Sequence, residues 1–114
     1  MRPFVIIFPH LPVRGMAFFP FVIYRHSAYA RDAEIANHEH IHLRQQLELL
    51  IVPFYFFYVL NYLVNRIRYD THQQAYEQIV FEREAFANDH DLDYLRRRPM
   101  YSFLKFWNDP KGKP

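Results

Sequence analysis

Cysteine is absent from this 114-residue chain, and only two glycines are present. Without cysteine the chain can form no disulfide, no cysteine-based zinc finger and no thiolate nucleophile. Neither glycine belongs to a G-x-G-x-x-G or P-loop pattern, which excludes a glycine-rich phosphate-binding loop. Any metal ion must therefore be held by histidine and carboxylate side chains, a ligand set that suits zinc and tolerates other divalent ions.

A large excess of charge is also missing, because the net charge is only +2. The strongest basic run is Arg96-Arg97-Arg98, and such a run is more typical of a solvated face than of a nucleic-acid site. Nucleic-acid binding is therefore the weaker interpretation, and it would show as strongly salt-dependent binding. Residues 4–8 form an apolar run that is too short for a secretory signal, so we expect a cytoplasmic protein, with membrane association left open below.

The length predicts one domain over residues 1–114. The chain order indicates an α+β fold that is mostly helical. We expect short strands and loops in residues 1–30, a helical metal-binding core in residues 32–90 and a basic, aromatic C-terminal segment in residues 91–114. With 19% aromatic residues in so short a chain, a homodimer or another partner is also expected to cover part of the surface.

Two strands are predicted near the N-terminus. Residues 4–8 are β-branched and aromatic and lie between prolines, which is typical of a short strand. Residues 16–24 predict a second strand, and Pro20 within it indicates an edge strand or a break, because proline cannot donate to a ladder. An edge strand beside an active site can bind a peptide substrate as an added strand. Residues 25–31 predict a loop.

His38, Glu39 and His42 form an H-E-x-x-H motif within a predicted helix. Residues four apart lie on the same helix face, so both imidazoles can reach one metal ion. Glu39 is turned by about 100° from His38 and is close enough to take a proton from a metal-activated water. The alternative is a solvated helix face, since seven histidines make a chance match easier. His40 points about 160° away from His38 and is expected to be structural or at the surface.

The helix that carries the motif is predicted to begin after an Asp32 N-cap. It is predicted to run to about Val52 and to break or kink at Pro53. Its core stripe is predicted to consist of Ala36, Leu43, Leu47 and Leu50.

Residues 49–64 contain no charged side chain. As a straight helix they would span about 24 Å, which is less than the roughly 30 Å of a bilayer core. The first interpretation is a buried core helix with a tyrosine edge. The alternative is a helix at a membrane surface, with Tyr55, Tyr58 and Tyr62 at the level of the headgroups.

A further helix is predicted from about Thr71, where Thr71-His72-Gln73-Gln74 has the spacing of a capping box. Glu82 lies on the same face of this helix as Ala75 and Ile79. A carboxylate on an apolar face is costly without a partner, and a metal ion is the natural one; the alternative is an arginine such as Arg44.

Two more glutamates and the chain beyond this helix carry weaker signals. Glu77 and Glu84 lie on another face of the helix and are predicted to be solvated. Residues 100–107 predict a short helical segment that packs back on the body.

Taken together, His38, Glu39, His42 and Glu82 give the chain a resemblance to gluzincin-type zinc metallopeptidases, and to small bacterial minigluzincin-like proteins. In that group H-E-x-x-H is joined by a glutamate on a later helix, commonly within E-x-x-A-D. Here Glu82-Arg83-Glu84-Ala85 matches E-x-x-A, but Phe86 replaces the aspartate. The supporting role is then either unfilled or taken by another group, for which Asp89 is the candidate. The resemblance covers roughly residues 16–90.

The resemblance implies a minimal zincin-like fold with a small sheet, an H-E-x-x-H helix and a glutamate helix. It implies that His38, His42 and Glu82 hold Zn²⁺ and that Glu39 is the general base of a hydrolase acting on a peptide or protein substrate. The oxyanion needs a further donor. The sequence leaves several candidates for this or a supporting role: Tyr76, His72, Tyr101 and Asp89.

Two other functions stay open from the sequence. One is a non-catalytic zinc-binding protein of the same fold, in which the chain itself fills the open coordination position. The other is a membrane-associated interaction protein anchored by residues 49–64.

Overall fold

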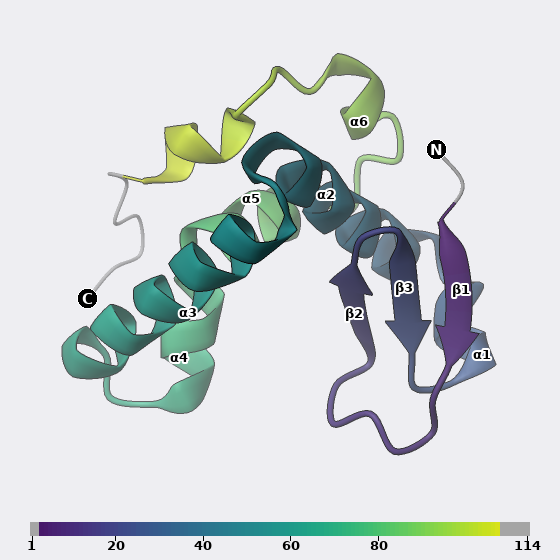
Figure 1. The fold of residues 1–114 in the computed structure, drawn as a ribbon, viewed down its shortest axis with the longest axis horizontal. Coiled ribbons are helices and arrows are strands. Elements are labelled where there is room, and N and C mark those ends of the chain that lie inside the picture. Colours follow the sequence, from purple (N-terminus) through teal and green to yellow (C-terminus); the bar gives the residue numbers. More distant parts are fainter. Residues whose placement is uncertain (1–2, 108–114) are drawn as a thin grey trace.

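The computed structural model describes residues 3–107, which form a small N-terminal sheet followed by helices (Figure 1). The predicted α+β class, mostly helical, is confirmed. The strands are β1 (Phe4–Ile7), β2 (Gly15–Phe18) and β3 (Phe21–Tyr24). The helices are α1 (Ser27–Ala30), α2 (Ala33–Leu49), α3 (Ile51–Arg68), α4 (His72–Glu77), α5 (Val80–Asn88), α6 (Tyr94–Arg97) and the 3₁₀ helix η1 (Ser102–Phe106). Residues 108–114 of the predicted C-terminal segment lie outside the described residues.

The sheet has the order β1-β3-β2, with β1 parallel and β2 antiparallel to β3. Of the two alternatives predicted for residues 16–24, the break at Pro20 is confirmed: β2 and β3 are separate strands that meet at the cis peptide bond between Phe19 and Pro20. Proline has a fixed φ and no N–H, so it suits the turn rather than the ladder. The sheet packs on α2 through a cluster of Ala17, Val22 and Tyr24 with Leu43.

The N-terminus of α2 is as predicted, since Asp32 Oδ1 accepts hydrogen bonds from the backbone N–H groups of Glu34 and Ile35 at 3.0 and 3.1 Å. The C-terminus differs. The helix ends at Leu49, Leu50 has a φ of 69°, and α3 then leaves at an angle of 112° to α2. Pro53 is the third residue of α3, where no helical partner for its missing N–H is needed. The break predicted at Pro53 therefore comes three residues earlier, at Leu50.

The buried face of α2 is mostly polar rather than apolar. Of the predicted stripe, Leu43 is fully buried, but Leu47 and Leu50 are 45% and 68% exposed. The buried residues of α2 are instead Asn37, His38, Glu39, Ile41, His42, Leu43, Gln45 and Gln46. This face is buried because its side chains hydrogen-bond to the rest of the chain, a pairing that hydrophobic periodicity does not register.

Helix α3 is not the buried core helix that its composition first suggested. Its buried residues are Phe54 and Asn65, whereas eight of its large apolar side chains are exposed. The three tyrosines Tyr55, Tyr58 and Tyr62 pack inward against the core. Among the described residues no single helix is long and apolar enough to cross a membrane; α2 and α3 reach that length and composition only as a sharply bent pair.

The capping box predicted at Thr71 and Gln74 is present at the start of α4. The helix is interrupted at Gln78 and Ile79, and α5 then begins at Val80, whose backbone N–H donates to Asn61 Oδ1 at 2.8 Å.

The main core lies where α3, α5 and η1 meet. It contains Phe54, Ile79, Val80, Phe81 and Phe103. Phe103 belongs to η1, so the C-terminal segment packs back on the body as predicted. The loop predicted for residues 25–31 contains the one-turn helix α1.

Candidate metal centre

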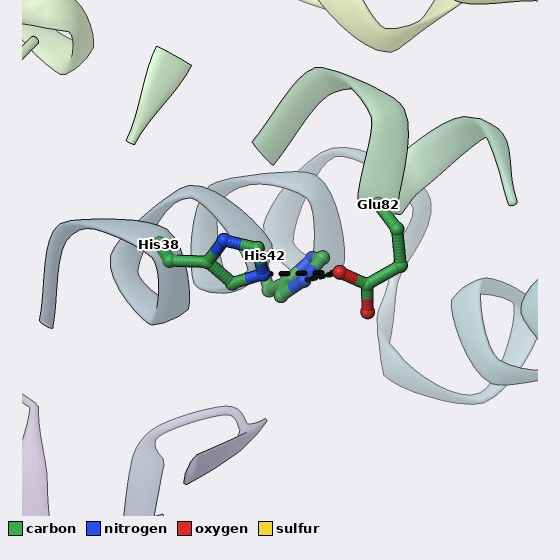
Figure 2. A group of neighbouring side chains, drawn as sticks. All are labelled: His38, His42 and Glu82. Carbon is green, nitrogen blue, oxygen red and sulfur yellow. Dashed lines mark hydrogen bonds and ion pairs between the residues drawn. The ribbon is translucent and has the colours of Figure 1, made fainter. Parts of the chain in front are cut away.

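Two helices bring His38, His42 and Glu82 together. The histidines are one turn apart on α2, and Glu82 faces them from α5 (Figure 2). The Nε2 atoms of His38 and His42 lie 3.0 and 3.1 Å from the same oxygen, Glu82 Oε1. All three residues are buried, and one ligand atom from each lies within 4.8 Å of the others. The motif and the downstream glutamate thus form one compact donor set of two nitrogens and a carboxylate.

His38 is oriented by its second ring nitrogen. Its Nδ1 donates to Asp89 Oδ2 at 3.0 Å, and its ring packs edge-on against Phe86 with the centroids 4.5 Å apart. Asn37 Nδ2 donates to the carbonyl oxygens of Asp89 and Asp91 at 2.9 and 3.0 Å, which fixes the turn after α5. Asp89 therefore lies where a carboxylate holds a metal-binding histidine in place, although Phe86 occupies the aspartate position of the motif.

His42 is oriented by Gln45, a residue that the sequence did not single out. Gln45 Nε2 donates to Phe81 O at 3.1 Å and to Glu84 Oε1 at 2.9 Å. The Oε1 of Gln45 must then be an acceptor, and it accepts a hydrogen bond from the Nδ1–H of His42 at 2.8 Å. A neutral imidazole that donates from Nδ1 has its lone pair on Nε2. The hydrogen-bond network thus directs the His42 lone pair toward Glu82.

The Nε2 of His42 is buried and has no hydrogen-bond partner. It faces Glu82 Oε1, which is also an acceptor, so a cation or a proton must lie between them. Burial lowers the pKa of His42, but Glu82 outweighs burial, and the pKa rises to about 9. Burial raises the pKa of Glu82, while His42 and His38 bring it below its usual range.

The spacing of the donor atoms fits a small divalent ion. Two ligand atoms that each lie about 2.1 Å from a tetrahedral zinc ion are about 3.4 Å apart. The two nitrogen-to-oxygen distances of 3.0 and 3.1 Å come close to this value. The residues present therefore fit a zinc ion with a small outward movement of Glu82.

Glu39, the predicted general base, is buried on α2 beside the start of β2. A β-carbon at Gly15 would lie 3.1 Å from Glu39 Oε2, so glycine leaves the space that the carboxylate occupies. Burial is the largest effect on the pKa of Glu39 and raises it. The two histidines lower this pKa and Glu82 raises it, and the net result is an increase. A carboxylate with a raised pKa is better matched to proton transfer near neutral pH.

Tyr58 is a second residue of the site that the sequence did not assign. Its hydroxyl donates to Glu82 Oε2 at 2.5 Å. Burial, followed by the charge of Glu82, raises the pKa of Tyr58, so the hydroxyl keeps its proton and remains a donor. A tyrosine in an uncharged helix needs a partner for its hydroxyl, and that requirement is the signal that could have found it.

The three predicted oxyanion donors occupy different places. Tyr76 is half-buried against the main core, and its ring contacts that of Phe86; burial, followed by the Glu82 charge, raises its pKa. His72 is exposed, and its Nδ1 lies 2.8 Å from the Tyr62 hydroxyl. Tyr101 begins η1 and its ring contacts Phe103. No hydrogen bond or ring contact among the described residues joins Tyr101 to the donor set.

The free edge of β2 is partly closed. The carbonyl of Ala17 accepts from Gln46 Nε2 at 2.9 Å and from the Tyr55 hydroxyl, and the Phe19 N–H donates to Gln46 Oε1 at 2.7 Å. The Arg25 N–H donates to Arg14 O across the ladder. The backbone N–H and C=O groups of successive residues point to opposite sides of a strand. Because the carbonyl of Arg14 faces β3, the backbone groups of Gly15 face the free edge. Within the described residues, only that end of the β2 edge, beside Glu39, keeps free backbone groups.

A buried ion cluster lies behind the donor set and corrects two predictions. Glu84, predicted to be solvated, is fully buried. Arg98, predicted to belong to a solvated basic run, contacts Glu84 Oε2 through Nε at 2.5 Å and Glu48 through both terminal nitrogens at 2.6 and 3.0 Å. Tyr94 donates to Glu84 at 2.5 Å. Sequence patterns predict that charged residues are exposed. Here Arg98 and the two glutamates can be buried because they neutralise one another.

Comparison with protein-family models, curated proteins and solved structures gives no match. The function is therefore inferred from the geometry of the site and from the residues of the motif.

Proposed function

We propose that this protein is a zinc-dependent metallopeptidase in which His38, His42 and Glu82 hold the metal and Glu39 is the general base. One observation carries the proposal. Two histidine nitrogens converge on one buried carboxylate oxygen, and the Nε2 of His42 has no hydrogen-bond partner. Structural histidines in a core normally pair each nitrogen with a partner of its own, so two nitrogens that share one carboxylate oxygen support a pair of metal ligands.

Each residue has a distinct task in this proposal. Zinc, when bound, supplies a Lewis acid that acidifies water and polarises a carbonyl group. Glu39 accepts the proton of the attacking water at its carboxylate and returns it to the leaving amine. Asp89 and Gln45 keep the histidines in the tautomer that directs Nε2 toward the metal. Tyr76 is the best placed of the candidate oxyanion donors.

Elemental analysis of the purified protein after zinc reconstitution and dialysis tests the metal site. We expect about one zinc ion per chain in the parent and in Glu39→Gln, and a loss of most of the zinc in Glu82→Ala, because three protein ligands define a site of this type. Glu77→Ala is the matched control, since Glu77 is an exposed glutamate on the neighbouring helix α4. A parent protein that binds no zinc at neutral pH would overturn the proposal.

The catalytic step is tested in the same preparations with a library of fluorescence-quenched peptides. Cleavage by the parent that is lost in Glu39→Gln, with zinc retained, is the expected result, because this substitution removes the proton acceptor and leaves the ligands in place.

A non-catalytic zinc-binding protein is the second candidate, and the closed edge of β2 favours it. Gln46 and Tyr55 occupy the backbone groups of Ala17 and Phe19 that an added substrate strand would use. Stoichiometric zinc in the parent without cleavage of any library peptide would select this second function.

A further inference from the structure

The outer face of α3 is a continuous apolar surface without a covering element. Eight large side chains on it are between 44% and 86% exposed. On a helical projection they fall within an arc of about 160°. They are Val52, Phe56, Phe57, Val59, Leu60, Leu63, Val64 and Ile67. A patch of this kind on a small protein marks a surface that meets a partner or a membrane.

This apolar face continues beyond the helix onto the sheet. A groove of about 520 Å³, lined by apolar atoms, lies along α3 beside Phe18 of β2. Phe18 pairs in register with Phe21 of β3, and the exposed ring of Phe21 contacts that of Phe4, with the centroids 5.7 Å apart. The exposed apolar surface therefore extends from α3 across the outer face of the sheet.

The charged side chains of α3 itself are both basic. Arg66 and Arg68 are exposed, and on the helical projection each stands about 20° beyond one margin of the apolar arc. Helix α3 contains no aspartate or glutamate. Trp107, the single tryptophan of the chain, lines a second groove with Phe57 and Arg68 at one of these margins. Arginine and tryptophan at the borders of an apolar face are typical of a helix at a lipid headgroup layer.

We propose that α3 lies flat on the surface of an anionic lipid bilayer, with its apolar face among the acyl chains and Arg66 and Arg68 at the headgroup phosphates. The helix is 18 residues long, or about 27 Å. No described helix is long and apolar enough to span a bilayer, and the opposite face of α3 is fixed to the core through Phe54 and Asn65. The helix therefore lies in the interface and does not cross it.

Charge complementarity selects the bilayer over a second copy of this chain. In a two-fold dimer the same face meets itself, and α3 offers no carboxylate to pair with Arg66 or Arg68 of the other copy. Anionic headgroups supply the missing negative charge at the C-terminal end of α3, where both arginines lie. This inference does not depend on the proposed peptidase function, because the metal ligands lie on α2 and α5.

Co-sedimentation of the full chain with large unilamellar vesicles of phosphatidylcholine and phosphatidylglycerol (3:1) tests the proposal. We expect the parent to bind, with a blue shift of Trp107 fluorescence. Binding should fall on the order of tenfold in Phe56→Glu and in Ile67→Glu, because each places a charge among the acyl chains. Leu92→Glu is the matched control, since Leu92 is equally exposed away from α3, and it should bind as the parent does.

Several results would overturn the proposal. One is a parent that fails to sediment with the vesicles, and another is equal binding to vesicles of phosphatidylcholine alone. Equal loss in Leu92→Glu would overturn it as well, because binding would then not be specific to α3. A dimer in solution that Phe56→Glu converts to monomers, without vesicle binding by the parent, would assign the face to a second copy. Circular dichroism of each variant shows whether it is folded.

Discussion

At the level of single residues, the site combines ligands that the motif identifies with supporting residues that it does not. Helix geometry places His38 and His42 on one face of α2, and the need of a carboxylate on an apolar face for a partner singles out Glu82 on α5. Gln45 and Tyr58 could not be assigned with the same certainty. Gln45 bonds to Glu84 and Tyr58 bonds to Glu82. These partners are distant in the sequence, so local sequence patterns do not predict the contacts.

Gln45 provides a test of this supporting role. Gln45→Ala removes the acceptor that fixes the tautomer of His42, and such losses typically reduce metal affinity by about 10–100-fold. Competition for zinc with a chromogenic chelator measures the change. Gln46→Ala is the control, because the neighbouring Gln46 bonds to the backbone of β2 instead of His42. Equal losses in both variants would show that general destabilisation, rather than the orientation of His42, governs zinc binding.

At the level of elements, caps were easier to predict than breaks. Asp32 and Thr71 both cap helices as their residue types indicate. The break between α2 and α3 was misplaced because proline is the usual signal, whereas the chain turns at Leu50, whose φ of 69° and ψ of 155° favour glycine. The uncharged composition of residues 49–64 favoured a buried core helix over a surface helix. The structure shows a helix with one face of each kind, because its tyrosines pack on the core and its other large apolar side chains are exposed.

Glycine should stabilise the fold at Leu50, because the backbone there has a positive φ. Leu50 is 68% exposed, so Leu50→Gly loses little packing and relieves backbone strain of order 1–3 kcal/mol. Because glycine also costs about 0.5–1 kcal/mol of backbone entropy, we expect a net gain of about 1 kcal/mol in the free energy of unfolding, measured with urea. Leu47→Gly, within α2 and also exposed, should lose about 1 kcal/mol. A loss in both variants would show that Leu50 is not strained.

At the level of the whole molecule, the C-terminal segment is part of the architecture of the site. Arg98 neutralises Glu84 and Glu48, and Glu84 in turn accepts from Gln45, which orients His42. The candidate metal centre at α2 is thus joined to residues more than fifty positions later in the chain. Hydrophobic patterning could not reveal this connection, because charged residues are placed at the surface by default.

Arg98→Ala tests the connection. Removing one partner of a buried ion cluster leaves uncompensated charges and typically costs about 3–5 kcal/mol, and we expect a loss of this size in the free energy of unfolding together with weaker zinc binding. Arg97→Ala is the control, because Arg97 is exposed and pairs with Asp91 at the surface; such pairs contribute about 0–1 kcal/mol. Similar values for the two variants, from the same urea titrations, would contradict the structural role of Arg98.

The ion cluster also determines when the site can form during synthesis. The H-E-x-x-H helix leaves the ribosome long before Arg98 does, since chains emerge from the N-terminus at about 5–20 residues per second. Until Arg98 emerges, Glu84 and Glu48 lack the cation that allows them to be buried. The nascent chain would therefore present its histidines first in an open form, and capture of the proposed zinc ion would be one of the last steps in its maturation.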